Sequence, residues 1–272
     1  MSSERIAILG PKGTFSEEAA LRFNPDLERA AYSSIEEVFD AVRGGAARYG
    51  VVPVENSLEG SVSATLELLL KSDIQICREI VLDITHCLMA LPGTGIQEIE
   101  EVISHPHALA QCRGFLKTLP GVKTRNFPST AEAAREIASK GLSKTAAIGS
   151  RIAADLYGLS ILEEGVEDEE RNQTRFFVLS KECPEKSGQI KTSIVIAVRD
   201  RPGALYEILG YFARGGVNLT KIESRPTKKS LGDYIFYIDF LGDAGDERIR
   251  GILEKVAGLT TFFKVLGSYS TG

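Results

Sequence analysis

The sequence has no long apolar run, no excess of positive charge and few cysteines. No stretch approaches the roughly 20 consecutive apolar residues of a membrane-spanning helix, so no membrane partner is expected. The formal net charge is −5 and the Lys and Arg residues are scattered, which argues against a nucleic-acid surface. With 43% hydrophobic and 25% charged residues, the composition is typical of a soluble globular protein.

The four cysteines, Cys77, Cys87, Cys112 and Cys183, show no C-x-x-C spacing. This pattern indicates neither a zinc site nor a disulfide framework, and it fits a reducing cytoplasm. The first predicted strand begins at Arg5, which leaves no room for a signal peptide before it. We therefore expect a cytoplasmic protein.

The chain is long enough for two or three domains, each with its own core. Strand-like and helix-like segments alternate, which favours an α/β architecture with largely parallel sheets. The expected strands are 5–9, 49–54, 102–103, 122–127, 145–148 and 174–180, with an extended segment over 74–91. The expected helices start near Phe15 and cover 35–43, 61–71, 106–117, 131–139 and 150–157.

Three helix starts have the spacing of a capping box, in which the first side chain accepts a hydrogen bond from the backbone three residues later. The pairs are Thr14 with Glu17, Ser33 with Glu36, and Ser129 with Glu132. Residues 163–170 are strongly acidic, and a solvated loop is the simplest prediction for them.

The chain is expected to cross between two lobes twice, within 74–91 and through 174–180. The predicted lobes are about 1–80 plus 174–181, and 81–173, which together form a catalytic region over 1–181. Two α/β lobes joined by two crossings make a cleft, a favoured place for a ligand.

Residues 182–191 contain a proline, a glycine and several charges, and are predicted to be a linker. The C-terminal region, 192–272, has the order βαββαβ of a ferredoxin-like domain. Its expected strands are 192–198, 217–225, 234–240 and 261–266, and its expected helices are 204–214 and 246–256.

The segment Asn172-Gln173-Thr174-Arg175-Phe176-Phe177 leads from polar groups into an apolar strand. A fixed hydroxyl beside a guanidinium suits an anionic substrate that must lose a hydroxyl group. The alternative is a strand edge with ordinary solvated polar residues, because short motifs often arise by accident.

Three further segments favour the substrate site over the ordinary strand edge. They are Gly10-Pro11-Lys12-Gly13-Thr14-Phe15-Ser16, Val51-Val52-Pro53-Val54-Glu55-Asn56-Ser57-Leu58-Glu59-Gly60 and Ser104-His105-Pro106-His107-Ala108-Leu109-Ala110-Gln111-Cys112. Together with Thr174-Arg175-Phe176, in this order, they closely resemble prephenate dehydratase. Gly203-Ala204-Leu205-Tyr206 and Glu223-Ser224-Arg225-Pro226 resemble the ligand motifs of the ACT regulatory domain. The resemblance implies a bilobal catalytic region, similar to periplasmic binding proteins, followed by a dimerising ACT domain.

Prephenate carries two carboxylates and a ring hydroxyl, and it loses carbon dioxide and water to become aromatic phenylpyruvate. The resemblance implies that Thr174 donates to the departing hydroxyl. Because a threonine hydroxyl is a poor acid, we expect a positioned donor that relays a proton, with Glu55 as its source. Burial after a strand would raise the pKa of Glu55, whereas an ionised helix cap is the alternative.

The other candidate site residues divide by their chemistry. The amides Asn56 and Gln111 can orient a carboxylate or hydroxyl without titrating, and Ser104 can present its hydroxyl to the cleft. Arg175 is the natural carboxylate clamp, with a surface ion pair as the alternative. Free amides at the start of the first helix can bind an anion. The expected catalytic residues are Thr174, Glu55, Asn56, Ser104 and Gln111, and the expected substrate-binding residues are Arg175, Phe176, Thr14 and Ser16.

No cofactor and no metal are expected. The loop before the first helix lacks the full G-x-G-x-x-G pattern of a dinucleotide site. His105 and His107 flank Pro106 without a third ligand nearby, so structural or supporting roles are expected for them. His86 is predicted to be core or edge, and the resemblance gives Glu59 no role.

In the C-terminal domain, the helix start at Gly203 can accept an amino acid's carboxylate. We expect L-phenylalanine to bind between paired domains of a homodimer or homotetramer, one subunit contributing 203–205 and its neighbour 223–226. The alternative is that these are ordinary turn residues. The implied effector residues are Gly203, Ala204, Leu205, Asn218, Leu219, Glu223, Ser224, Arg225 and Pro226.

The leading prediction is a prephenate dehydratase, a carbon–oxygen lyase of phenylalanine biosynthesis that phenylalanine inhibits. One alternative is the same chemistry on arogenate, which carries an amino group in place of the ketone. The other is a non-catalytic amino-acid sensor. A fused chorismate mutase is not expected, because no long helical segment precedes Arg5.

Overall fold

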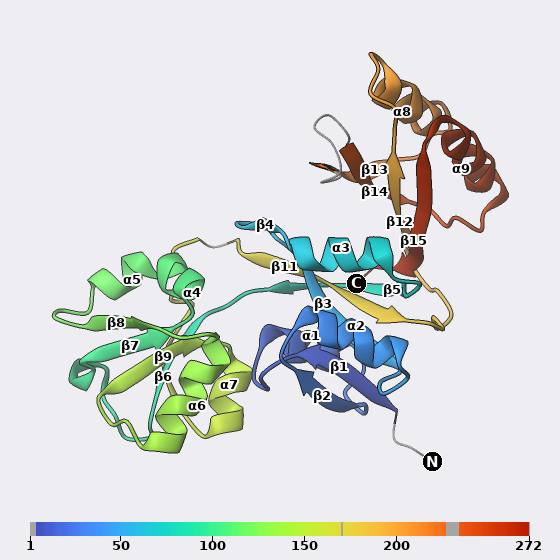
Figure 1. The fold of residues 1–272 in the computed structure, drawn as a ribbon. Coiled ribbons are helices and arrows are strands. Elements are labelled where there is room, and N and C mark those ends of the chain that lie inside the picture. The colour runs from blue at the N-terminus through green and yellow to red at the C-terminus, as the bar shows by residue number, and fades with distance from the viewer. Residues whose placement is uncertain (1–3, 170, 227–233, 272) are drawn as a thin grey trace. The chain divides into compact units, whose positions relative to one another are not determined.

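The computed structural model describes residues 4–169, 171–226 and 234–271 (Figure 1). The chain divides into two compact units, unit 1 with Met1–Thr65 and Ile80–Phe176, and unit 2 with Leu66–Glu79 and Phe177–Gly272. The division falls within one helix and two strands, so the predicted functional boundary at residue 181 stays a prediction. In the described part of the chain, no helix has the length and apolarity to cross a membrane.

Unit 1 contains two sheets. In the first, β1 is the centre of a parallel trio with β2 and β3, β11 lies beside β3, and the short β4 is antiparallel to β3. β1 and β3 are nearly continuous apolar runs, which suits strands buried on both faces. The elements are β1 (Arg5–Leu9), α1 (Phe15–Phe23), β2 (Glu28–Tyr32), α2 (Ile35–Arg43), β3 (Tyr49–Asn56), β4 (Gly60–Ser61), α3 (Ser63–Lys71) and β11 (Gln173–Ser180). From Leu66 onward α3 belongs to unit 2, and so does β11 from Phe177 onward.

The second sheet has the order β10-β6-β9-β7-β8, with β6 antiparallel to both of its neighbours. Its strands are β6 (Cys87–Ala90), β7 (Glu101–Ser104), β8 (Lys123–Asn126), β9 (Thr145–Gly149) and β10 (Ser160–Glu164). Cys87 and Met89 of β6 belong to one hydrophobic cluster, and Leu88 and Ala90 to another. Because successive strand residues face opposite sides, this sheet has a core on each face.

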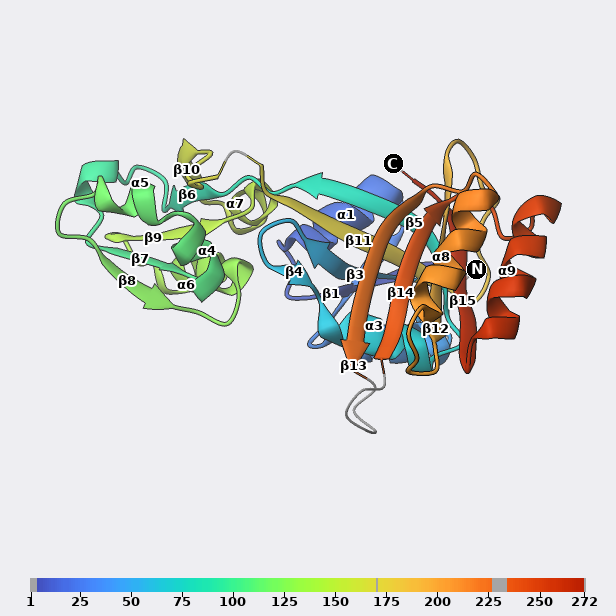
Figure 2. The same cartoon turned by 90° about the horizontal axis from the view of Figure 1, so that it is seen from above.

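Helices cover both faces of the second sheet (Figure 1). They are α4 (Pro106–Gln111) and α5 (Arg113–Lys117) with one cluster, and α6 (Thr130–Lys140) and α7 (Arg151–Tyr157) with the other. Figure 2 shows them from above. A short 3-10 turn, Ile96–Glu98, precedes β7.

The single helix predicted over 106–117 is in fact two helices that meet at Cys112. The backbone N–H of Gly114, at the start of α5, donates to both carboxylate oxygens of Asp168, at 2.8 and 3.0 Å. The acidic segment is therefore not simply a solvated loop, because its carboxylate caps a helix.

Two of the three capping predictions need correction. Ser129 accepts from the Glu132 N–H at 3.0 Å, as predicted. The cap of α2 is Ser34 instead of Ser33, and it accepts from the Glu37 N–H at 3.2 Å. Helix α1 begins at the predicted residue, but its N-cap Thr14 makes no side-chain cap and donates to the Leu9 carbonyl instead.

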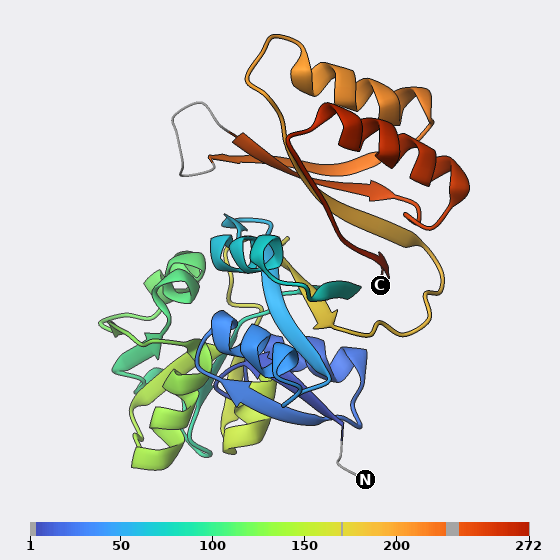
Figure 3. The same cartoon turned by 45° about the vertical axis from the view of Figure 1, so that its right-hand side comes forward.

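Unit 2 contains the predicted βαββαβ domain (Figure 3). Its sheet order is β13-β14-β12-β15, and β15 continues into a parallel contact with β5 (Gln75–Asp83). Both helices pack on one face through a core of aliphatic residues and two phenylalanines, Phe212 and Phe240, whose rings meet at a tilt of 46°. The elements are β12 (Ile190–Ala197), α8 (Ala204–Arg214), β13 (Leu219–Pro226), β14 (Tyr234–Leu241), α9 (Glu247–Leu259) and β15 (Phe262–Ser270).

Half-buried polar contacts tie β5 and the end of α3 to the ferredoxin-like domain within unit 2. The Lys191 ammonium lies 2.7 and 2.9 Å from the two carboxylate oxygens of Glu79. The Lys264 ammonium donates to the carbonyls of Leu69 and Leu70, at 2.8 and 3.1 Å, and also to Ser72. These carbonyls lie at the C-terminal end of α3, where cations are favoured.

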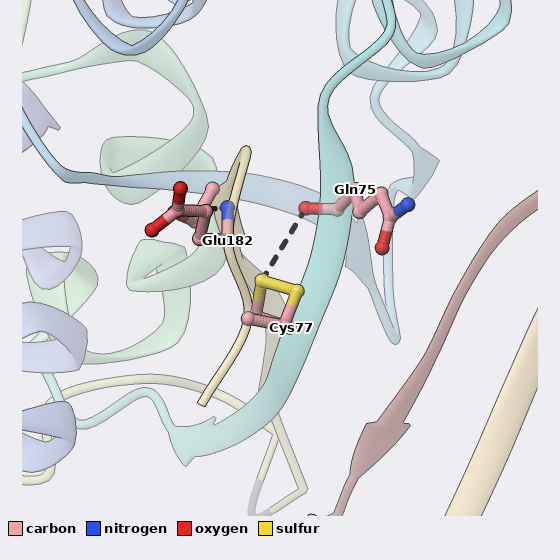
Figure 4. Close-up of a disulfide and its surroundings, with 5 residues drawn as sticks. Gln75, Cys77 and Glu182 are labelled. Atoms are coloured by element: carbon pink, nitrogen blue, oxygen red, sulfur yellow. Dashed lines mark hydrogen bonds between the residues drawn. A yellow bond between two sulfur atoms is a disulfide. The ribbon is translucent and has the colours of Figure 1, made fainter. Parts of the chain in front are cut away.

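Unit 2 also contains a disulfide between Cys77 and Cys183, with the Cα atoms 5.0 Å apart (Figure 4). The expectation of no disulfide was therefore wrong. Spacing motifs detect only local pairs, whereas these residues are 106 positions apart and lie on β5 and just after its neighbour β11. The other cysteines are free and buried, and burial raises the pKa of Cys87 to about 11 and that of Cys112 to about 12.

Candidate active site

A pocket of about 310 Å³ in unit 1 brings together residues from both predicted lobes. Asn56, Gln111 and Thr174, three of the five predicted catalytic residues, line it. Its other polar lining residues are Glu59, His86, His105, His107, Ser129, Thr130 and Asn172. The prediction of a cleft between the lobes is therefore supported by a defined pocket.

The side chains on one wall form a closed ring of hydrogen bonds. The Asn56 amide nitrogen donates to the Asn172 oxygen at 2.8 Å, and the Asn172 nitrogen donates to the Gln111 oxygen at 3.2 Å. The Gln111 nitrogen donates to the Glu59 carboxylate at 3.3 Å. The Glu59 backbone N–H donates back to the Asn56 oxygen at 3.1 Å and closes the ring.

Thr174 is attached to this ring through Asn56. The second N–H of the Asn56 amide donates to the Thr174 hydroxyl oxygen at 2.9 Å. In that bond the hydroxyl is the acceptor, so its own proton is left for another group. Because Thr174 lies at the pocket wall and does not donate its proton to Asn56, its hydroxyl can serve as a donor to a bound ligand.

His86 joins the ring from the opposite side. Its Nε2 lies 3.0 Å from the Gln111 oxygen, which only accepts, so Nε2 carries the proton. The imidazole of His86 is buried, and this burial lowers its pKa, whereas Gln111 and Glu167 act in the opposite direction. The backbone N–H of His86 donates to the Glu167 carboxylate at 2.8 Å, and its carbonyl accepts from Val166. His86 is thus more than the core or edge residue expected, because it lines the pocket.

Glu59 and the two histidines of α4 form a second cluster on the pocket wall. The Glu59 carboxylate contacts Nδ1 of His107, and the His107 N–H donates to the His105 ring at 3.3 Å. Burial lowers the pKa of His105, with a smaller effect of His107 in the same direction. Within residues 4–169, 171–226 and 234–271, no group of three or more His, Cys, Asp or Glu is placed to hold a metal ion.

Two predicted catalytic residues do not line the pocket. Ser104 is fully buried and its hydroxyl donates to the Ile148 carbonyl at 2.6 Å, so it does not present its proton to the cleft as expected. The Glu55 side chain is 36% exposed instead of buried, and it lies 3.7 Å from the Arg175 guanidinium. The strand before Glu55 is buried, but the side chain lies at its half-exposed end.

The predicted substrate-binding residues are also outside the lining. Arg175 faces Glu55, Phe176 is buried in the core, Thr14 donates to Leu9, and Ser16 is buried at the start of α1. Their roles stay predictions.

Three helix starts do reach the pocket wall. Phe15 opens α1, His105 is the N-cap of α4, and Ser129 with Thr130 begins α6. Helix N-termini are electropositive and carry free N–H groups, so this wall suits an anion.

The predicted effector residues all belong to unit 2. Gly203 is the N-cap of α8, and its φ of +81° is a backbone conformation that favours glycine. Glu223 lies between Lys221 and Arg225 on β13, at 3.1 and 3.5 Å from their nitrogens. Leu219 also lies on β13, and the Asn218 carbonyl accepts from Leu241. Whether they bind an amino acid stays a prediction.

Two α/β lobes around a polar pocket, followed by a ferredoxin-like domain, define a bilobal enzyme of the periplasmic-binding-protein fold with a regulatory module. The family model for prephenate dehydratase matches residues 6–184, and the ACT domain model matches residues 192–258. The chain belongs to the prephenate dehydratase family.

Similar proteins agree with this assignment. A prephenate dehydratase from Methanocaldococcus jannaschii is 45% identical over 267 residues, which are 95% of this chain and 95% of that protein. The solved structure of the Arthrobacter aurescens prephenate dehydratase in complex with L-Phe has a TM-score of 0.89 and 37% identity, and covers 98% of this chain and 89% of that one. GqqA, described as a novel type of quorum quenching acylase, has a TM-score of 0.90 and 30% identity, and covers 99% and 98%.

Proposed function

We propose that this prephenate dehydratase converts prephenate to phenylpyruvate in the pocket around Thr174, as a carbon–oxygen lyase of L-phenylalanine biosynthesis. The observation that carries the proposal is the Asn56–Thr174 hydrogen bond, because it makes Thr174 an acceptor towards Asn56 and a donor towards the pocket. A hydroxyl held in this way is suited to a leaving hydroxyl group.

In the proposed reaction, the bond from the ring carbon to its carboxylate breaks and its electron pair enters the ring. The ring then expels the hydroxyl group at the opposite carbon, and the departing oxygen takes a proton to leave as water. Carbon dioxide, water and an aromatic ring result. Aromatisation makes the reaction favourable, so the protein needs mainly to orient the substrate and to stabilise charge on the leaving oxygen.

We propose that the two substrate carboxylates bind near the starts of α1 and α6, with Arg175 as the predicted clamp. The pocket lining includes Phe15, Ser129 and Thr130 at those helix starts, which supports an anionic ligand. Arg175 does not line the pocket, and its ion pair with Glu55 supports a role for Glu55 in orienting the guanidinium. The Glu59–His107 pair, which does line the pocket, is our proposed source of the proton that the leaving oxygen takes.

The test is an ultraviolet assay of phenylpyruvate formed from prephenate by the purified protein. Turnover of prephenate supports the proposal, whereas turnover of arogenate alone supports the arogenate alternative. Binding of either compound without turnover supports the non-catalytic sensor. The same assay with Arg175→Lys measures the clamp, because loss of the two-pronged contact raises KM more than it lowers kcat.

We further propose that L-phenylalanine inhibits the enzyme by binding between ACT domains of a homodimer or homotetramer. The ACT match and the helix start at Gly203 support this. Light scattering with and without L-phenylalanine measures the assembly, and inhibition of the assay measures regulation. A protein that stays monomeric and is not inhibited contradicts the proposal.

For location we propose the cytoplasm, since a doubly charged substrate and its product do not cross a bilayer unaided. The Cys77–Cys183 disulfide makes this testable, because such bonds are uncommon in reducing compartments. Alkylation of thiols in freshly lysed cells followed by mass spectrometry reports the redox state of the pair.

A further inference from the structure

The ring of amides in the pocket has only one possible direction. Its two ends are both on Glu59, whose backbone N–H only donates and whose carboxylate accepts from the Gln111 nitrogen. The Asn56 oxygen is held again by the Leu58 N–H at 2.9 Å. Turning any one amide around would place N–H against N–H on one side and oxygen against oxygen on the other.

Asn172 is the middle member of this ring and its most enclosed amide. Its side chain accepts from Asn56 and donates to Gln111, and the residue is only 4% exposed. Its backbone carbonyl accepts from the Ile84 N–H at 2.7 Å, which fixes the position of the residue. A buried amide that loses a partner pays a desolvation cost without compensation, so a change at Asn172 disturbs both neighbours.

Hydrogen bonds that run head to tail polarise one another, so each amide strengthens the next. The ring has two branches, the Asn56 donation to Thr174 and the His86 donation to Gln111. The Thr174 branch leads to the group that our proposed function places in the reaction.

We propose that Asn172 is a positioning residue for Thr174. It closes the one-way ring that holds Asn56 as the donor to the Thr174 oxygen, and so leaves the Thr174 proton directed at the pocket ligand. The inference rests on the proposed function for its kinetic consequence, but the ring itself exists without substrate.

The variant Asn172→Asp tests this with almost no change of shape. One carboxylate oxygen still accepts from Asn56, while the other oxygen faces the Gln111 oxygen and cannot donate. Near neutral pH we expect kcat for prephenate to fall about tenfold with a small change in KM, as for the loss of about one hydrogen bond. As the pH is lowered, the aspartic acid becomes protonated and can donate to Gln111 again, so the ratio of variant to wild-type kcat rises.

A matched control makes the same chemical change outside the pocket. Asn24→Asp keeps the hydrogen bond in which the Asn24 oxygen accepts from the Asp26 N–H at 3.0 Å, and it should leave kcat unchanged at every pH. A ratio that is flat or that falls as the pH is lowered overturns the proposal.

The double variant Asn172→Asp/Thr174→Ala tests whether Asn172 acts through Thr174. We expect its kcat to equal that of Thr174→Ala alone, because the hydroxyl that Asn172 positions is already absent. Full additivity of the two losses overturns the proposal.

Nuclear magnetic resonance of the ligand-free protein separates this inference from the proposed function. The side-chain NH₂ protons of Asn56 and Gln111 should exchange slowly in wild type and faster in Asn172→Asp. If they do so while prephenate is not a substrate, the proposed function fails and the ring survives. Fast exchange of these protons in wild type overturns the ring itself.

Discussion

The pocket wall of unit 1 and the junction of β5 and α3 with the ferredoxin-like domain in unit 2 use different chemistry. In unit 1, the pocket wall is held by uncharged amides, Asn56, Asn172 and Gln111, with a charge only at the Glu59 end. In unit 2, the contacts that join β5 and the end of α3 to the ferredoxin-like domain are made by ammonium groups, with Lys191 on Glu79 and Lys264 on helix carbonyls.

This difference matches two physical tasks. An amide presents a donor and an acceptor in a fixed relation, so it can transmit direction without changing charge with pH. A buried ion pair constrains the orientation of its partners less than an amide does. Breaking the pair leaves a buried charge without compensation, so the pair couples two segments firmly. The amide wall of the pocket is thus suited to orientation, and the ammonium contacts of unit 2 are suited to attachment.

Of the variants that test this difference, Lys191→Met is expected to have the largest effect, and the effect is on stability. Lys191→Met removes one partner of a pair whose side chains are 16% and 5% exposed, and should lower the unfolding free energy by about 3 to 5 kcal/mol. Guanidinium unfolding followed by circular dichroism measures the change. The double variant Lys191→Met/Glu79→Leu should regain most of the stability.

Lys144→Met is the matched control for that experiment. The Lys144 ammonium also pairs with a glutamate, Glu100, but both side chains are more than half exposed. No measurable change in stability is expected, since exposed ion pairs are screened by water. Equal losses at Lys144 and Lys191 would contradict the distinction between the units.

The next effect is expected at Thr174 and should appear in kinetics instead of stability. Thr174→Ala should lower kcat by about a hundredfold with a much smaller change in KM, because its contact strengthens as the leaving group departs. Thr174→Ser should recover much of the loss, since it keeps the hydroxyl. Wild-type turnover in the alanine variant would remove Thr174 from the mechanism.

The smallest effect is expected at His86, in the uncharged part of the pocket wall, and it concerns how stability changes with pH. Burial lowers the pKa of His86, so the folded protein binds this proton less readily than the unfolded chain does. The stability that His86 contributes is therefore present above its unfolded pKa of about 6.5 and is lost as the pH falls below it. The unfolding free energy of wild type should fall more between pH 7.5 and 5 than that of His86→Gln, which keeps a donor for Gln111. Parallel curves would show that His86 titrates normally.

Most of the architecture could be predicted from the sequence, because local patterns encode it. The bounds of α2 and α8 are those expected, and the βαββαβ order is confirmed. The split of the helix at Cys112 could not be predicted, because its cause is a carboxylate, Asp168, more than fifty residues away along the chain. The disulfide escaped for the same reason.

The candidate site was predictable only in part. Asn56, Gln111 and Thr174 carry motif signals and do meet at one pocket. His86 and Glu59 carry no such signal, because their importance comes from two partners each that only the fold supplies. Asn172 lies within a polar run that the sequence shows, but its donor and acceptor assignments depend on neighbours from two other elements, β3 and α4.

The Cys77–Cys183 bond turns the chain from a line into a closed loop with two tails. The loop holds the whole second sheet and its helices, while the ACT domain follows as the C-terminal tail. A single proteolytic cut anywhere between the two cysteines leaves one covalent molecule, and electrophoresis separates the pieces only after reduction.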